Sequence, residues 1–176
     1  KGRDPDWEKK VHHQPHVVYL ALSSAVKVGV TRKSQVPTRW IDQGAHSAIV
    51  LAETPYRQLA GLIEVALKKS VTDRTHWQRM LKNEIAVGVD LVAEKKRLSG
   101  CVPEELTSYI TRDETVCPIR YPVKKYPEKV KSVTFEKMDV FSGVLSGVKG
   151  QYLILSDGRV FNVRRHTGYE VQVAMG

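Results

Sequence analysis

The sequence predicts an α+β protein in two parts: a small domain with a three-stranded sheet and flanking helices, then a small all-β unit. Three observations predict this class. Short β-branched runs and amphipathic helical segments follow one another up to residue 115, as is typical of α+β domains. From residue 116 onward, glycine and proline interrupt β-type runs. The composition, with 41% hydrophobic and 27% charged residues over 176 positions, is that of a folded chain.

The N-terminal part is expected to be an arm followed by a β-hairpin. Residues 1–15 are polar, contain two prolines and lack apolar periodicity, so we interpret them as an extended arm before a domain of residues 16–115. Two β-branched runs, 16–22 and 26–31, then flank the small residues 23–25. Such an arrangement is typical of two antiparallel strands joined by a short loop.

The register of this hairpin decides which side chains share a face. A loop of three residues would place Tyr19 opposite Gly29 and put Lys27 on the same face, whereas a loop of two residues would move Lys27 to the other face. Because glycine has no side chain, we expect one side of the Tyr19 ring to stay open to a ligand.

Helices are expected after the hairpin. Pro37 begins a short helix that Gly44 ends, and the apolar run 47–52 has the character of a buried strand. Thr54 and Pro55 are a natural N-cap and first residue for the next helix, in which apolar residues recur with helical spacing. Further helices are predicted over residues 76–84, over residues 90–98 and from Pro103.

Residues 116–176 are predicted to form a β-barrel-like unit of SH3-like or OB-like size. Prolines mark a linker-like start, the segment KVKSVTFEKM has the composition of a strand, and three glycines interrupt the later runs: Gly143, Gly147 and Gly150. Glycines at such places suit the bends and bulges of a small curved sheet.

A hairpin and a final strand are expected near the end of this unit. The dipeptide Asp157-Gly158 is a strong signal for a two-residue turn, and a last strand is predicted over residues 170–174. Strand alternation then places four side chains on one face as a small core: Tyr152, Ile154, Phe161 and Val163.

Charge and cysteine usage restrict the partners. The chain has 28 Lys and Arg against 19 Asp and Glu, a net charge of +9, and so favours polyanions such as nucleic acid. Cys101 and Cys117 are too few for a disulfide framework, and we expect free thiols in a cytoplasmic protein. No apolar run approaches the roughly 18 to 20 residues of a membrane helix, so no membrane partner is expected.

Phosphate chemistry is the expected activity of the first domain. Arg32, Lys33 and Arg39 surround a predicted helix N-terminus, which favours anions, and Glu64 flanks an apolar stripe where a carboxylate could hold a single Mg²⁺ ion. Tyr19 could accept a proton if Lys27 lowered its pKa. Alternatively, Tyr19 is a packing residue and Glu64 pairs with Lys68 four residues later.

A second set of basic residues is expected to contact nucleic acid from the β unit: Arg159, Arg164 and Arg165. They alternate with the aromatic residues Tyr152, Phe161 and Tyr169, an arrangement that suits stacking of single strands with phosphate contacts. The alternative is that the aromatic residues fill a small core while the basic ones are solvated.

The run VYLALSSAVKVGVT, with Arg39 ten positions after Gly29 and Glu64 in a later helix, resembles the GIY-YIG nuclease superfamily. The resemblance covers about residues 16–70 and implies roles for Tyr19 as general base, Arg39 as phosphate clamp and Glu64 as the Mg²⁺ ligand. The sequence departs from the superfamily pattern at several positions: Val17 replaces the motif glycine, Lys27 replaces the second tyrosine, Gln43 replaces a histidine, and Asn83 is only a loose candidate for the distal asparagine.

A longer resemblance spans nearly the whole chain. The segments LAGLIEVALKK and VKGQYLILSDGRVFNVRRHTGYEV, together with the hairpin run, are similar to an uncharacterised bacterial and archaeal family, a domain of unknown function. Members carry a Cys-rich segment upstream, which implies that His12 or His13 could complete a zinc site with such a segment.

Together these observations predict a nucleic-acid-acting protein, with Mg²⁺-dependent phosphodiester hydrolysis as the activity. A DNA- or RNA-binding module without catalysis and a protein-interaction scaffold remain the alternatives.

Overall fold

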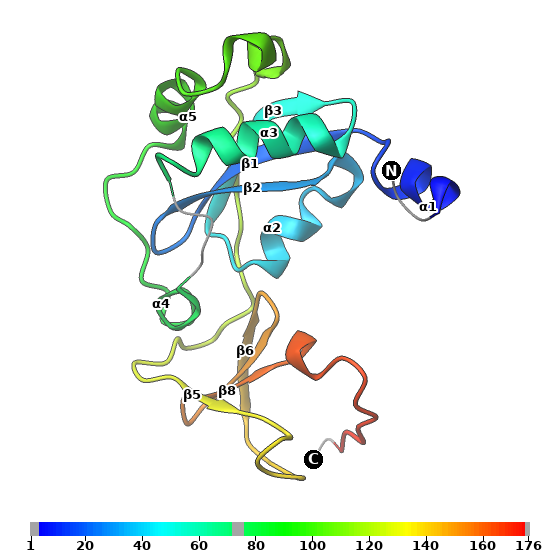
Figure 1. Cartoon of the computed structure of the whole chain (residues 1–176). Coiled ribbons are helices and arrows are strands. Elements are labelled where there is room, and N and C mark those ends of the chain that lie inside the picture. Colours follow the sequence, from blue (N-terminus) through cyan, green and yellow to red (C-terminus); the bar gives the residue numbers. More distant parts are fainter. Residues whose placement is uncertain (1–3, 72–75, 175–176) are drawn as a thin grey trace. The chain divides into compact units, whose positions relative to one another are not determined.

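The computed structural model describes residues 4–71 and 76–174, and the chain divides into two compact units, residues 1–120 and 121–176 (Figure 1). Each unit contains one four-stranded sheet, and helices accompany mainly the first. The predicted α+β class is therefore confirmed.

The first sheet has the strand order β2-β1-β3-β4 and is antiparallel throughout. Its strands are β1 (His16–Leu22), β2 (Val26–Arg32), β3 (Ser47–Thr54) and β4 (Cys117–Pro118). Only three strands were expected. The fourth arises because the linker-like stretch pairs two residues, Cys117 and Pro118, with β3, a pairing too short to leave an alternating pattern in the sequence.

The predicted hairpin register is confirmed. The loop between β1 and β2 has three residues, and Tyr19 lies opposite Gly29 while Ala21 lies opposite Lys27. Because residues two apart in a strand point to the same face, Lys27 and Gly29 lie on the Tyr19 face of the hairpin.

The helices of the first unit mostly match the predicted segments. They are α1 (Pro5–Val11), α2 (Thr38–Asp42), α3 (Arg57–Leu67), α4 (Trp77–Leu81) and α5 (Leu91–Ser99), with short 3-10 turns at Lys33–Gln35 and Glu104–Tyr109. The predicted start of α3 at Thr54 is wrong. Thr54 ends β3 instead, and its hydroxyl donates to the Tyr56 carbonyl at 3.1 Å.

The extended arm predicted for residues 1–15 is also wrong where the structure describes it, because α1 occupies part of this stretch. One side-chain oxygen of Asp4 accepts the backbone N–H groups of Asp6 and Trp7 at 3.1 and 3.0 Å. Pro5 is the first helical residue, a position that proline favours. This capping motif starts a helix without any apolar periodicity.

The two faces of β1 pack against different helices (Figure 1). Val18 and Leu20 belong to the main core, together with Ile63 of α3. Tyr19 alternates with them and so points to the opposite face, where its ring lies 5.9 Å from that of Trp40 on α2. All seven residues of β1 are buried.

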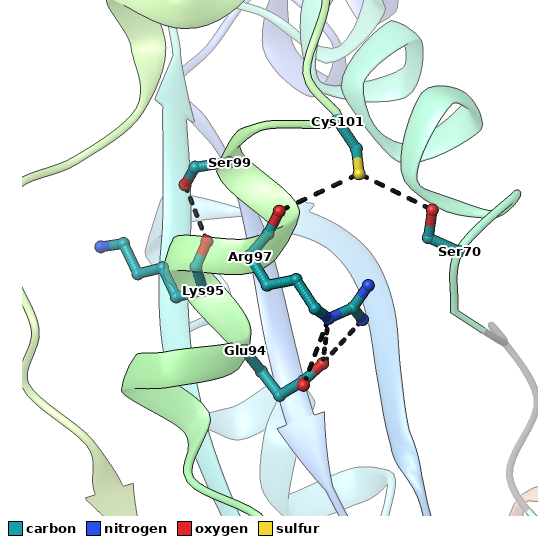
Figure 2. Close-up of polar contacts among 6 residues, drawn as sticks. All are labelled: Ser70, Glu94, Lys95, Arg97, Ser99 and Cys101. Atoms are coloured by element: carbon teal, nitrogen blue, oxygen red, sulfur yellow. Dashed lines mark hydrogen bonds and ion pairs between the residues drawn. The ribbon is translucent and has the colours of Figure 1, made fainter.

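Polar contacts tie the end of α5 to the end of α3 (Figure 2). The Ser70 hydroxyl donates to the Cys101 sulfur at 3.7 Å, and the Cys101 thiol lies 4.0 Å from the Arg97 carbonyl. Arg97 also pairs with Glu94 at 2.8 Å. Cys101 and Cys117 are both free thiols, as predicted.

The second unit contains a four-stranded sheet that does not close into a barrel, so the predicted barrel-like form is not confirmed. Its strands are β5 (Lys131–Val133), β6 (Leu145–Lys149), β7 (Tyr152–Leu155) and β8 (Arg159–Asn162), in the order β5-β8-β7-β6. The outer strands have only three and five residues, and β5 joins parallel to β8. The segment 122–124 pairs along β6 through a bridge between Val123 and Gly147 and through backbone hydrogen bonds. A bulge precedes Gly147, whose missing Cβ would lie 2.6 Å from Val123 Cα.

The expected two-residue turn in this unit is replaced by a three-residue loop, 156–158. Ile154 therefore pairs with Val160, and Leu153 pairs with Phe161. This one-residue slip moves Phe161 to the face opposite Ile154, so the predicted core face is wrong. The glycine of the loop, Gly158, adopts a φ of +83°.

The strand predicted over residues 170–174 does not form. The segment has the alternation of a strand, but no described strand pairs with it. Val171 and Val173 remain 52% and 77% exposed.

Candidate functional site

Five polar side chains are linked around Tyr19 by hydrogen bonds or by their charges. We call this group the hairpin-face cluster. Its members are Tyr19 of β1, Lys27 of β2, Arg39 of α2, Gln43 directly after α2, and Glu64 of α3. The Tyr19 hydroxyl donates to Gln43 Oε1 at 2.9 Å and also contacts the Arg39 guanidinium. Arg39 acts electrostatically on Lys27, and Glu64 acts on Tyr19.

Tyr19 is fully buried, which contradicts the prediction of an open ring. A Cβ at position 29 would lie 2.6 Å from both Cζ and the hydroxyl oxygen of Tyr19. The tyrosine ring itself thus occupies the space that glycine leaves. Gly29 permits the Tyr19 ring to lie flat on the hairpin, but it does not leave the ring exposed to solvent.

The pKa of Tyr19 is raised, so the prediction that Lys27 lowers it is wrong. Burial is the largest cause of the raised pKa, the positive charge and the hydrogen bond of Arg39 oppose it in part, and the Glu64 carboxylate raises the pKa further. Near neutral pH the phenol is therefore protonated and acts as a hydrogen-bond donor to Gln43.

Lys27 of the cluster is a buried amine with a lowered pKa. Its side chain is almost fully buried, at 3% exposure. Burial, and secondarily the charge of Arg39, lowers its pKa to about 8. An anion placed beside Lys27 and Arg39 would offset the repulsion between their charges.

Glu64 forms the predicted ion pair with Lys68, and its role as a Mg²⁺ ligand stays a prediction. Its side chain is 24% exposed and its carboxylate lies 3.7 Å from the Lys68 ammonium, as the four-residue spacing predicts. The same carboxylate is close enough to Tyr19 to raise the pKa of the phenol.

The residues present offer a divalent cation only part of a coordination shell. Within residues 4–71 and 76–174, no group of three or more His, Cys, Asp or Glu side chains could hold a metal ion. Mg²⁺ commonly binds through one or two carboxylates, waters and substrate phosphates. Glu64 alone thus could not form a site made only of protein ligands. It fits an ion that a bound phosphate helps to hold.

The histidines of the N-terminal segment do not form a metal site among themselves. His16 is buried, its Nδ1 donates to the Gln14 carbonyl at 2.6 Å, and burial lowers its pKa. The ring of His12 lies 5.0 Å from Trp7, and that of His13 lies 6.4 Å from Tyr56. The zinc site with a Cys-rich segment stays a prediction.

Arg32 and Lys33 lie outside the hairpin-face cluster. Lys33 forms an ion pair with Glu53 at 2.6 Å. Arg32 lies near His16 and lowers the pKa of that ring. Neither side chain has a described contact with Tyr19 or Arg39, so their predicted phosphate contacts gain no support from the geometry.

The basic residues of the second unit are partly neutralised. Arg159 pairs with Asp157 at 2.7 Å and donates to the Ser142 carbonyl at 2.6 Å. Arg165 pairs with Glu136 at 2.8 Å. Arg164 is exposed, and the described part of the chain holds no carboxylate within ion-pair distance of it.

The aromatic residues of the second unit form a packed cluster. Phe161 and His166 are buried and stack with ring centroids 4.4 Å apart, and Phe135 packs edge-on against both. Tyr169 lies 5.8 Å from Phe135 and is 51% exposed. This arrangement favours the core interpretation over a stacking surface for most of these rings.

The role of Gln43 was not recognised from the sequence. Gln43 was noted only as a replacement for histidine, yet its Oε1 accepts the hydrogen bond from the Tyr19 hydroxyl; its spacing of four from Arg39, one helical turn, was the available signal. Trp40 beside Tyr19 is buried, and its Nε1 has no hydrogen-bond partner among the described residues, which no sequence pattern indicates.

The fold and the site define a two-unit α+β protein with a buried, polar cluster on one hairpin face. No helix in the described ranges is long and apolar enough to cross a membrane. The chain belongs to the family described as "Protein of unknown function (DUF2797)", whose model matches residues 1–171. The predicted uncharacterised family is thus confirmed, while the GIY-YIG resemblance stays a prediction. No curated protein and no solved structure matches the chain.

Proposed function

We propose that this protein acts on nucleic acid and hydrolyses phosphodiester bonds at the hairpin-face cluster. The observation that carries the proposal is that Arg39 and Glu64, from two helices, both act on the Tyr19 hydroxyl of β1, while Arg39 also acts on Lys27 of β2. If these side chains served only to pack the core, the positive charges of Lys27 and Arg39 would not be expected to lie near each other, because they repel.

Arg39 is the residue best placed to bind a phosphate. It is partly exposed, and its guanidinium is held against the buried Tyr19 hydroxyl. A guanidinium binds phosphate oxygens through paired, charge-assisted hydrogen bonds. Lys27 adds a second positive charge behind it, and the net charge of +9 attracts a polyanion over longer distances.

Glu64 would hold a Mg²⁺ ion together with oxygens of the bound phosphate. When bound, such an ion polarises the phosphate and a water molecule. Lys68 lies 3.7 Å from the same carboxylate and would have to turn away, which its exposed side chain permits.

The proposal is tested by incubating the 176-residue chain with labelled single- and double-stranded DNA and RNA, with Mg²⁺ or with EDTA. We expect Mg²⁺-dependent cleavage that Arg39→Ala and Glu64→Gln each abolish. Lys96→Ala is the matched control, because Lys96 is exposed and pairs with Glu114 at 3.2 Å, outside the hairpin-face cluster. Thermal melting of each variant checks the fold. Absence of cleavage on every substrate contradicts hydrolysis.

A binding module without catalysis is the second candidate. It is favoured by the burial of Tyr19, whose hydroxyl donates a hydrogen bond to Gln43. It is also favoured by the fact that the cluster contains a single carboxylate. In this case wild-type protein binds nucleic acid without cutting it, and its affinity falls steeply with salt. Arg39→Ala then weakens binding on all sequences, and a salt-independent affinity contradicts both candidates.

A third candidate, an interaction scaffold, draws on the second unit. Val140, Val144 and Val173 are 82%, 72% and 77% exposed, and large exposed apolar patches mark interaction surfaces. Under this candidate, the double variant Val140→Asp, Val144→Asp should abolish capture of a protein partner and leave nucleic-acid binding unchanged.

A further inference from the structure

We propose that one end of the second sheet binds the phosphate backbone of nucleic acid through four exposed lysines. We call this surface the basic end, and its members are Lys124, Lys125, Lys129 and Lys131. The proposal rests on the proposed action on nucleic acid and deepens it, because it assigns to the second unit a surface that holds the strand outside the hairpin-face cluster.

Strand pairing defines this end of the sheet. Leu145, the first residue of β6, pairs with Leu155, the last residue of β7. Lys131 and Arg159, the first residues of β5 and β8, pair with each other. The loop 156–158 joins β7 to β8 between these two pairs, so all of them lie at the same end.

The other three lysines are held at this end by backbone contacts. The N–H of Lys124 donates to the Ser146 carbonyl at 2.8 Å, and the Ser146 hydroxyl donates to the Lys125 carbonyl at 3.1 Å. On the loop between β7 and β8, the missing Cβ of Gly158 would lie 2.6 Å from the Lys129 carbonyl oxygen. The chain that carries these lysines therefore crosses the end of the sheet from the β6 edge to the β5 edge.

The spread of the lysines suits a polyanion. Four steps between neighbouring strands separate β5 from the segment 122–124 beside β6, which at about 4.8 Å per step amounts to about 19 Å along the sheet. Phosphates along one strand of duplex DNA follow one another at about 3.4 Å. Several consecutive phosphates can thus face the basic end, whereas a single small anion would meet only one or two of its lysines.

The charges of the basic end are not already neutralised. All four lysine side chains are exposed, and none forms an ion pair with another residue in the described part of the chain. Two carboxylates lie on the same segment and on the adjoining loop, those of Glu128 and Asp157, and Asp157 is paired with Arg159 at 2.7 Å. Phosphate binding at these lysines therefore breaks no ion pair of their own.

Lysine contacts of this kind recognise the backbone and not the bases. An ammonium group is a compact point charge without the paired donors of a guanidinium, and contacts to phosphates carry no direct sequence information. We therefore expect binding that depends weakly on sequence and strongly on salt.

The test compares two variants that each lose four positive charges. The basic-end variant replaces all four of its lysines by alanine. The control variant replaces four exposed lysines elsewhere by alanine, three in the first unit and one beyond the other end of β5: Lys9, Lys69, Lys96 and Lys137. Fluorescence anisotropy of a labelled single-stranded DNA and of the matched duplex, in EDTA, measures binding as salt is varied, and thermal melting checks the fold of both variants.

We expect the slope of log affinity against log salt to become shallower in the basic-end variant by about 2.8 on single strands and by about 3.6 on duplex, because each neutralised phosphate contributes about 0.7 and about 0.9. Between about 50 and about 200 mM salt, wild-type affinity for single strands should then fall about 50-fold more than that of the variant. The control variant should keep the wild-type slope, although its net charge equals that of the basic-end variant.

The outcomes separate the two proposals. If the basic-end variant binds like the control variant with the same salt slope, the basic end is overturned as a binding surface, and cleavage that Arg39→Ala abolishes leaves the proposed function standing. If the basic-end variant binds as expected and wild type cleaves no substrate, the basic end stands and hydrolysis fails. If wild type binds polyglutamate or phosphatidylserine vesicles and no nucleic acid, the proposed partner is overturned.

Discussion

The contact between Gly29 and Tyr19 makes a sharp prediction for the variant Gly29→Ala. The new Cβ would lie 2.6 Å from Tyr19 Cζ and from its hydroxyl oxygen, and 3.1 Å from Cε1, whereas ordinary contact begins near 3.4 Å. The ring must therefore retreat by about 0.8 Å. Because Tyr19 is fully buried beside Trp40, the ring moves against a close-packed surrounding.

Overpacking of a close-packed core by one methyl group costs about 1–3 kcal/mol. We expect Gly29→Ala to lower the free energy of unfolding in urea by this amount. Gly61→Ala is the matched control. Gly61 lies inside α3 with no atom within 4 Å of the added Cβ, so this variant should be more stable by about 0.5–1 kcal/mol.

A double-mutant cycle identifies the cause. In a Tyr19→Val background the added methyl group meets no ring, so the cost of Gly29→Ala should shrink by at least about 1 kcal/mol, a coupling typical of residues in contact. An unchanged urea midpoint in Gly29→Ala, or strictly additive costs in the cycle, would refute the close packing described for this face.

Three further predictions follow from the same structure. Tyr19→Phe leaves the amide oxygen of Gln43 without its donor and should lower the free energy of unfolding by about 1–2 kcal/mol, measured in urea. The pKa of Lys27 is about 8 in the folded chain, so between pH 8 and 10 the unfolded chain binds more protons at Lys27 than the folded chain does. The free energy of unfolding should therefore rise with pH in this range, and Lys27→Met should flatten that rise. Asp90→Ala removes the acceptor of the Val92 and Ala93 N–H groups at the start of α5 and should cost about 0.5–2 kcal/mol; a melting temperature equal to that of wild type would contradict the cap.

The β1–β2 hairpin was predictable because local signals and strand pairing agree. Two β-branched runs flank three small residues, and the resulting register places Tyr19 against Gly29 as expected. What the sequence could not show is which other side chains cover that face. The burial of Tyr19 depends on Trp40 and Gln43 of the α2 region, more than twenty residues away in the chain.

The β7–β8 hairpin shows where local signals mislead. The dipeptide Asp157-Gly158 indicates a two-residue turn, yet the loop has three residues with only Gly158 in the left-handed region. The missing Cβ of Gly158 would lie 2.6 Å from the Lys129 carbonyl, so contact with a distant segment accompanies the loop geometry. Likewise, the pairing of Arg165 with Glu136 joins residues 29 positions apart, which no periodicity indicates.

The pKa shifts around Tyr19 could not be predicted from the sequence. The positions of Tyr19, Arg39 and Glu64 along the chain suggested that they lie near one another, and Arg39 and Glu64 do act on Tyr19. The direction of the shifts at Tyr19 and Lys27 follows mainly from burial, a property of the folded protein. Residue types alone therefore could not show that the pKa of Tyr19 is raised. The role of these residues as a site stays a prediction.

Mapping of a bound oligonucleotide by NMR tests the central claim most directly. A short DNA or RNA strand is titrated into ¹⁵N-labelled 176-residue protein in EDTA, which prevents cleavage, and the amide signals are followed. We predict that the largest shifts fall on residues 27–29 of β2 and 39–43 of the α2 region, and that Arg39→Ala removes them. Shifts confined to other residues, or none at all, would contradict a nucleic-acid site on the hairpin face.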